Sequence, residues 1–325
     1  MNTKWTGMFL INAIFVSLVF AIPAWGSDDY PSKPIRIFPA FKGGGLDVSS
    51  RLISEKMAQY LGQPVLVENK AGGGGALATA YVAASKPDGY TLVSVPPTHV
   101  SLPLTTRDLP YKMSDLIPVG RFVTFHQYIM VNKDSPFRTL DDLVGYGKKH
   151  PGTLSYSTSG FGGNTYLIME ILKLDHHIDL QFVPFPGGEL PAATALAGNN
   201  IQVAALGLAS SHALIRSGAI RPLAVLSTVR DPAYPQVPTT VEQGYTDLIN
   251  VGYYMLLAPA KTPSQVLSKL ESALERACQD KGVQEAISKM NSIADFQNSR
   301  DSQAMLDRDV KRWSQIVKRV GIVSK

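Results

Sequence analysis

Short apolar segments alternate with helical patterns along most of this 325-residue chain, and the alternation constrains the fold more than any other feature. Segments of strand character lie at 35–38, 65–68, 90–95, 128–132, 154–157, 180–183, 201–206, 223–227 and 252–257. Helical patterns lie between them at 48–61, 76–85, 140–150, 165–174, 190–197 and 211–217. Alternation of this kind predicts an α/β fold with layers around largely parallel sheets.

The C-terminal stretch 263–320 differs, because its pattern predicts helical segments with no strand between them. Val266, Leu270 and Leu274 recur at helical spacing, which core packing explains better than a partner surface. Helix ends are marked by a capping box at Thr139 and by glycines at 62, 198 and 218, where we expect left-handed C-caps.

The N-terminus predicts export. Lys4 precedes an apolar run over 8–22, and Ala24, Trp25 and Gly26 follow with small residues near a cleavage position. This pattern is typical of a secretory signal peptide, here 1–26, and the run is short for a membrane span. No cysteine ends the signal, so the lipid anchor of many exported receptors has no attachment residue. We therefore predict a soluble periplasmic protein that is not lipid-anchored.

The cysteine content and the charge argue against a disulfide-stabilised protein and against a nucleic-acid-binding protein. Cys278 is the one cysteine, so no intrachain disulfide can form, and we expect it in the core. The formal net charge of +5 is spread along the chain without a basic cluster. Nothing here is typical of a nucleic-acid partner.

The segment 35–57 carries the strongest functional signal: a strand runs into Gly43, Gly44 and Gly45, and a helix follows. Glycines can turn successive N–H groups toward one point beside a helix N-terminus, which makes an anion-binding cradle. Lys42 adds a positive charge to the loop, and this favours a small carboxylate or phosphate. Alternatively the glycines only form a tight turn and Asp47 only caps the helix.

Catalytic and metal-binding motifs are absent from the sequence. The histidines do not stand at metal-ligand spacing, and there is no nucleophile elbow, phosphate-binding P-loop or dinucleotide fingerprint. We therefore predict no enzyme activity, no metal and no cofactor. Small-residue loops instead follow several strands, at 69–78, 95–100, 157–166 and 185–190. Each could be an ordinary turn, but together they favour a ligand cleft beyond the strand ends.

Several segments in order resemble those of the Bug-type solute receptors of the tripartite tricarboxylate transporter family: YPSKPIRIF, GGGLD, GQPVLVENKAGGGG, KPDGYTL, VPTTVEQGY and LLAPAKTP. The resemblance spans about 30–321. It implies a two-lobed periplasmic binding protein of the Venus-flytrap, type II-like class, with a ligand cleft between the lobes. It also implies a small organic carboxylate as ligand and the membrane permease subunits of a tripartite transporter as partners.

Carried over residue by residue, the resemblance places ligand contacts on loops of both lobes. Those of the first lobe are Ala40, Phe41, Lys42, Gly43, Gly44, Gly45, Asp47, Gly73, Gly74, Thr98 and His99. Those of the second are Ser157, Ser159, Gly160, Asn164, Thr165, Tyr166, Phe185, Gly187, Gly188, Glu189 and Gly207. The chain departs from the family at Phe41-Lys42, Ala71, Thr165-Tyr166 and Leu206-Gly207, so the ligand itself stays open between di- or tricarboxylates, amino acids and aromatic acids.

The resemblance also implies lobe boundaries and leaves the receptor's role open. One lobe would comprise 27–124 and 251–325, and the other 125–250, in a monomer that closes about a hinge. Transport is one function and delivery of the liganded form to a membrane sensor is another. A secreted enzyme fits poorly, because no nucleophile, metal set or cofactor loop is present.

Two charges stand in the predicted ligand loops, Lys42 in one lobe and Glu189 in the other. They could pair across the closed cleft. Alternatively each serves the ligand, Lys42 binding a carboxylate and Glu189 an ammonium, which would indicate a zwitterion. Both could also simply face solvent.

Overall fold

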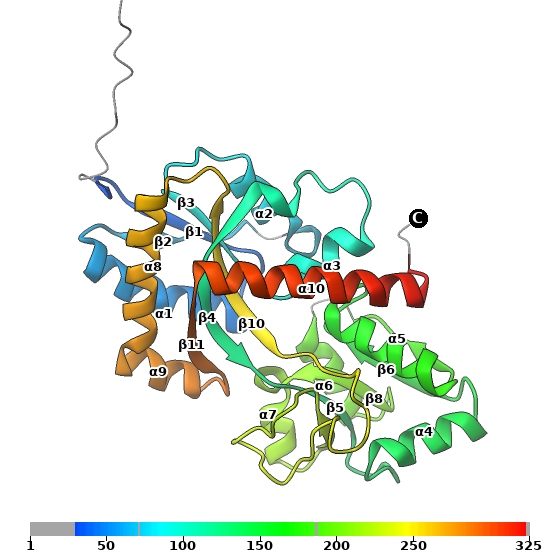
Figure 1. The fold of residues 1–325 in the computed structure, drawn as a ribbon. Coiled ribbons are helices and arrows are strands. Elements are labelled where there is room, and N and C mark those ends of the chain that lie inside the picture. The colour runs from blue at the N-terminus through cyan, green and yellow to red at the C-terminus, as the bar shows by residue number, and fades with distance from the viewer. Residues whose placement is uncertain (1–29, 71, 186–187, 323–325) are drawn as a thin grey trace, which may run out of the picture. The chain divides into compact units, whose positions relative to one another are not determined.

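Two mixed β-sheets with flanking helices make up the part of the chain that the computed structural model describes, residues 30–70, 72–185 and 188–322 (Figure 1). The first sheet contains, in spatial order, β11 (Ile293–Asn298), β4 (Leu116–Phe125), β10 (Gly252–Pro259), β3 (Thr91–Val95), β1 (Ile35–Pro39) and β2 (Val65–Val67). The second contains β7 (Leu180–Phe182), β6 (Leu154–Thr158), β8 (Val203–Gly207), β5 (Gln127–Asn132) and β9 (Ile220–Val225). The α/β fold with two sheets is therefore confirmed.

The expectation of largely parallel sheets is wrong. β1 pairs in parallel with β2 and β3, and β6 pairs in parallel with β7 and β8. The strand that enters each sheet from the other runs the opposite way: β10 is antiparallel to β3 and β4, and β5 is antiparallel to β8 and β9. Each sheet thus has a parallel half made by strand–helix–strand units and an antiparallel half made by crossing strands.

In each sheet, helices connect strands that follow one another along the chain. The helices between strands of the first sheet are α1 (Gly44–Leu61), α2 (Ala76–Ala83) and α3 (Thr98–Thr105), with 3₁₀ turns η2 (Gly73–Gly75) and η3 (Met113–Asp115). The second sheet has α4 (Leu140–Lys149), α5 (Asn164–His176), α6 (Glu189–Ala197) and α7 (Leu208–Arg216). The C-terminal part adds α8 (Ser264–Gln279), α9 (Lys281–Ser288) and α10 (Ser299–Val320), of which α8 and α10 pack on β4.

The strands β4 and β11 are present where no strand was expected. β11 lies between the C-terminal helices and is only partly buried, so its sequence IADFQN lacks an apolar alternation. β4 contains Pro118 and Gly120, which resemble strand breakers, but irregular pairing with β10 accommodates them. A Cβ on Gly120 would lie 2.8 Å from the Gln297 carbonyl oxygen, so this glycine allows β11 to approach β4.

Helix ends follow the predicted cap residues with one exception. Thr139 caps α4 as a capping box, its Oγ1 accepting a hydrogen bond from the N–H three residues on. Gly62 and Gly218 take the predicted left-handed conformation, with φ of 68° and 71°. The prediction for Gly198 is wrong, because its φ is −80°. The left-handed turn comes one residue later at Asn199, an amide residue that tolerates this conformation.

The C-terminal apolar stripes and the cysteine lie in the core, as predicted. Leu270 and Leu274 of α8 are fully buried, and Trp313 of α10 is 1% exposed. Cys278 is buried, and the loss of solvent raises the pKa of its thiol to about 12, so it stays a neutral apolar side chain.

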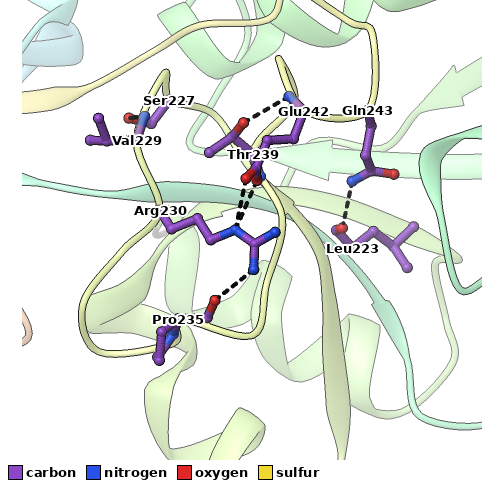
Figure 2. Close-up of polar contacts among 8 residues, drawn as sticks. All are labelled: Leu223, Ser227, Val229, Arg230, Pro235, Thr239, Glu242 and Gln243. Atoms are coloured by element: carbon purple, nitrogen blue, oxygen red, sulfur yellow. Dashed lines mark hydrogen bonds and ion pairs between the residues drawn. The ribbon is translucent and has the colours of Figure 1, made fainter.

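Residues 226–251 return the chain from β9 to β10 without a named helix or strand, and side-chain hydrogen bonds hold this segment in place (Figure 2). Arg230 donates from Nε to both oxygens of Glu242, at 3.0 and 2.9 Å, and from Nη1 to the Pro235 carbonyl. Glu242 also accepts from the Thr239 N–H, and the neighbouring Gln243 donates to the Leu223 carbonyl. These bonds order a long connection that would otherwise be flexible.

The two crossings between the sheets meet at Phe125, the last residue of β4. Phe125 pairs with Gly252 at the start of β10, and a Cβ on Gly252 would lie 2.1 Å from the Phe125 ring. The ring also lies 5.0 Å from that of Tyr254, centroid to centroid. Gly252 therefore makes room for an aromatic pair where the chain leaves and re-enters the first sheet.

The predicted signal peptide, 1–26, lies outside the described residues. Within the described ranges, every helix is too short or too polar to cross a membrane. The lobe boundaries stay a prediction: strands of the first sheet come from 35–125 and 252–298, and strands of the second from 127–225.

Candidate functional site

The loop between β1 and α1 combines glycines in the left-handed region with a buried carboxylate. Gly43 and Gly44 have φ of 73° and 70°, a region that other residues avoid. Helix α1 starts at Gly44, earlier than expected, and Gly43 is its N-cap residue. Asp47 lies inside the first turn, where its Oδ2 accepts from the Gly43 N–H at 2.8 Å and its Oδ1 lies 3.0 Å from Arg51 Nε. Asp47 thus ties the loop to the helix without standing at the cap position itself.

Replacing Asp47 by alanine should lower the free energy of unfolding by about 0.5–2 kcal/mol, because the Gly43 N–H loses its acceptor at a helix start. Urea denaturation measures this. Arg51→Ala is the control: the arginine side chain is half exposed, so losing the ion pair alone should cost less than about 1 kcal/mol. Equal effects of the two substitutions would contradict a bracing role for the Asp47–Gly43 bond.

The outer part of this loop is open to solvent. Phe41, Lys42, Gly43 and Gly44 are exposed, whereas Ala40 is buried and donates its N–H to the Ser94 carbonyl. The Lys42 ammonium forms no ion pair with any described residue. Its charge is therefore available to a ligand at the loop.

A second glycine turn, at Gly72–Gly75, lies against the first loop and the start of α3. All four glycines have positive φ, and a Cβ on Gly75 would lie 3.1 Å from the Cβ of Ala40. A cavity of about 10 Å³, near the volume that one water needs, is lined by Ala40, Gly74, Gly75, Thr79, Val95, Pro96, Thr98, His99, Leu102 and Tyr111. Of the predicted first-lobe contacts, Ala40, Gly74, Thr98 and His99 line this cavity, and Gly73 lies in the same turn as Gly74.

His99 is buried beside this cavity. Its ring stacks on Tyr111 with centroids 6.3 Å apart, and its Nδ1 has no hydrogen-bond partner among the described residues. Loss of solvent lowers the pKa of His99 to about 4. The imidazole is therefore neutral at neutral pH and can offer a hydrogen bond but not a charge.

The loop before α5 supplies hydroxyl groups from the second sheet. Ser159 Oγ lies 2.9 Å from Thr165 Oγ1, and Gly160 between them has a φ of 146°. Ser157 is fully buried, and its Oγ has no partner among the described residues. Tyr166 packs against three aromatic rings, those of Tyr156, Phe161 and Phe182. Its side chain therefore contributes to packing within the protein.

Asn164, the first residue of α5, is engaged within the protein. With its amide oxygen facing the indole of Trp313, that oxygen accepts from Nε1 at 3.0 Å. The amide nitrogen then donates to Ser101 Oγ and to the Pro97 carbonyl, at 3.1 and 3.2 Å. Asn164 therefore joins α5, α3 and α10, and its polar atoms are already satisfied.

Glu189 and Gly207 lie together at the starts of α6 and α7. The Gly207 N–H donates to both oxygens of Glu189, each at 3.2 Å, and Ser210 Oγ donates to Oε2 at 2.9 Å. Burial raises the pKa of Glu189, although these hydrogen bonds oppose the rise. Glu189 and Lys42 do not pair in this structure, so the pairing considered for a closed cleft stays one of the alternatives. Gly188 precedes α6 with a φ of 85°, and Phe185 packs against the core of the second sheet, while Gly187 lies outside the described residues.

Tyr254 belongs to this site but was not among the residues predicted for it. Its hydroxyl lies 2.5 Å from the position that a Cβ on Gly45 would take, so it touches the first glycine loop. The pKa of Tyr254 is raised by burial and, secondly, by the negative charge of Glu189. Tyr254 thus contacts the first glycine loop, and its pKa responds to the charge of Glu189. Its place in a strand far along the chain gave no local signal of this contact.

A larger cavity, of about 200 Å³, lies where the chain crosses between the sheets. It is lined by Pro97, Arg121, Thr124, Asn164, Ile249, Asn250, Val251, Tyr253, Met305, Asp309, Arg312 and Trp313. Among the described residues, no group of three or more histidine, cysteine, aspartate or glutamate side chains could hold a metal ion.

Comparison with known proteins identifies the family. The profile of the tripartite tricarboxylate transporter family receptors matches residues 49–322. Protein BugT of Bordetella pertussis is 29% identical, over 97% of this chain and 98% of BugT. A Rhodopseudomonas palustris protein solved with adipate is 26% identical with a TM-score of 0.82, over 91% of this chain and all of that one. MatC from the same species, solved with bound malate, is 28% identical with a TM-score of 0.76, over 89% of this chain and 100% of MatC.

The family match agrees with the fold, and it confirms the resemblance inferred from the sequence motifs. It extends over most of the described residues of both sheets. The chain therefore belongs to the receptor family of the tripartite tricarboxylate transporters, as a Bug-type solute-binding protein.

Proposed function

We propose that this protein is a periplasmic receptor that captures a small organic carboxylate between two lobes and delivers it to a tripartite membrane transporter. The observation that carries the proposal is the position of the helix starts. In both sheets helices follow the carboxyl ends of strands: α7 starts directly after β8, and α1, α3 and α5 start after short loops that follow β1, β3 and β6. Such starts present free N–H groups and a partial positive charge, and in open α/β sheets ligands lie at these strand ends.

The relatives solved with adipate and malate support a carboxylate as the ligand class. The hydroxyls of Ser159 and Thr165, the amides of the glycine turns and the charge of Lys42 can bind such a group with few buried charges. The lobes of this proposal are 27–124 with 251–325, and 125–250, which close about the crossings at Phe125 and Gly252. Export by the signal peptide 1–26, a monomeric state and the absence of an enzymatic reaction are parts of the same proposal.

A saturating carboxylate should stabilise the protein. At about 100 times its dissociation constant, a ligand that binds only the folded state adds about 2.7 kcal/mol to the free energy of unfolding. Thermal-shift assays with mono-, di- and tricarboxylates, amino acids and aromatic acids measure this as a rise in Tm. The proposal fails if none of these acids shifts Tm and native mass spectrometry finds no acid bound.

A pair of matched variants locates the binding site. Lys42→Met removes the exposed charge of the glycine loop, so it should reduce the shift produced by the best acid. Lys148→Met removes an exposed charge at the end of α4, remote from the loop in sequence, and should leave the shift unchanged. Equal shifts in both variants would place the acid elsewhere.

A further inference from the structure

The carboxylate of Glu189 lies at two helix starts of the second sheet, where it accepts hydrogen bonds from Gly207 and Ser210. Helix α6 begins at Glu189 itself, and α7 begins at Leu208, directly after Gly207. The Gly207 N–H and the Ser210 hydroxyl both donate to this carboxylate. Two helix starts and two donors therefore stabilise a negative charge that belongs to the protein.

Within the described ranges, no ion pair compensates this charge. Among the described residues Glu189 forms no ion pair with a lysine, arginine or histidine. Burial and, secondly, the negative charge of Glu189 raise the pKa of Tyr254. Tyr254 is thus a neutral phenol, and it also touches the glycine loop. A ligand between the two sheets would thus meet donors and Lys42 on one side and a negative charge on the other.

The carboxylate also retains capacity for a further donor. Two carboxylate oxygens offer about four lone-pair directions. Gly207 and Ser210 use some of these from the α7 side, and Glu189 as a residue is only partly buried. A ligand ammonium can fill the remainder with a charge-assisted hydrogen bond, whereas a ligand carboxylate at the same place would be repelled.

We propose that Glu189 makes the site selective for an amino-substituted organic acid, whose carboxylate binds the glycine and hydroxyl loops and whose ammonium binds Glu189. This inference rests on the proposed receptor function and names its ligand class. Glu189 is then a specificity-determining residue: it favours ligands that bring a cation and disfavours the same acids without one.

Matched ligand pairs test the inference on the exported wild-type protein. Aspartate and succinate differ only by the amino group, as do glutamate and glutarate, and isothermal titration calorimetry measures all four. We expect the amino acid of at least one pair to bind about 10- to 100-fold more tightly, the difference that one hydrogen bond between charged groups typically makes. Equal or tighter binding of the deaminated acid would overturn the inference and leave the receptor function standing. Binding of none of the four acids would also overturn the inference, whereas the receptor function fails only if the whole acid panel of the thermal-shift assay fails.

The variant Glu189→Gln keeps an acceptor for Gly207 and removes the charge. Its preference for the amino acid over the deaminated acid should fall toward unity, mainly through tighter binding of the deaminated acid. Glu285→Gln, an exposed site on α9, removes one negative charge elsewhere and should keep the wild-type preference. An unchanged preference in Glu189→Gln overturns the inference. If circular dichroism shows that this variant does not fold, the wild-type ligand pairs still decide.

Discussion

Replacement of Trp313 by alanine should lower the free energy of unfolding by about 3–5 kcal/mol, the range for truncating a buried large aromatic side chain. Trp313 lies on α10, which packs against β4, α3 and α5 and so contacts elements of both sheets (Figure 1). The side chain also lines the cavity of about 200 Å³, so truncation would enlarge an existing void. The loss of dispersion contacts is then not recovered by collapse of the surroundings.

Part of the expected loss of stability comes from the hydrogen bond between Trp313 and Asn164. Without the indole N–H, the buried oxygen of the Asn164 amide loses its donor, and an unsatisfied buried acceptor costs about 1–3 kcal/mol. Trp313→Phe separates the two contributions, because it keeps a ring and removes only the donor. Urea denaturation of the three proteins should rank them wild type, Trp313→Phe, Trp313→Ala in decreasing stability. A loss below about 1 kcal/mol for Trp313→Ala would contradict the assigned packing role.

Elements with a complete local pattern could be predicted from the sequence. Strands such as β1 and β5 are short apolar runs, and helix α4 has both its amphipathic spacing and its capping box at Thr139. β11 could not be predicted, because a half-exposed edge strand needs no apolar alternation. β4 was hidden by Gly120, whose missing side chain matters only once Gln297 of a distant strand lies against it.

In the candidate site, too, only the features with a local sequence pattern could be predicted. The glycine turns could be predicted because a run of glycines indicates positive φ angles. Gly43 and Gly74 do adopt such angles. The contact of Tyr254 with Gly45 joins residues far apart in sequence, and no local pattern encodes it. Likewise the sequence indicates that Asn164 starts a helix beside a ligand loop, but not that Trp313 already binds its amide.

Acidification should destabilise the protein through His99 before most carboxyl groups titrate. The pKa of His99 is lowered to about 4 in the folded state by burial, against 6.5 for an unperturbed histidine. The unfolded state therefore binds a proton at a higher pH than the folded state. The stability that the neutral imidazole contributes is fully present above pH 6.5 and is lost as the pH falls toward 4.

The expected size of this loss follows from the shift. Between pH 7.5 and 4.5, His99 should account for about 2–3 kcal/mol of the free energy of unfolding, since one pKa unit corresponds to about 1.4 kcal/mol. Urea denaturation at several pH values measures the slope. His99→Gln cannot titrate, so its stability should vary less across this interval, even though it starts from a lower value at pH 7.5.

A matched control separates His99 from other titrating groups. His150 is exposed at the end of α4, so His150→Gln makes the same chemical change at a surface position and serves as the matched control. Carboxylates with lowered pKa, such as Asp142 and Glu242, lose their stabilising charge as the pH falls through those lowered values, and they do so equally in all three proteins. Subtraction of the His99→Gln curve from the wild-type curve therefore isolates the buried imidazole. If the two curves are parallel from pH 7.5 to 4.5, His99 is not held neutral by burial, and its ring must instead be free to take a proton beside the glycine turns.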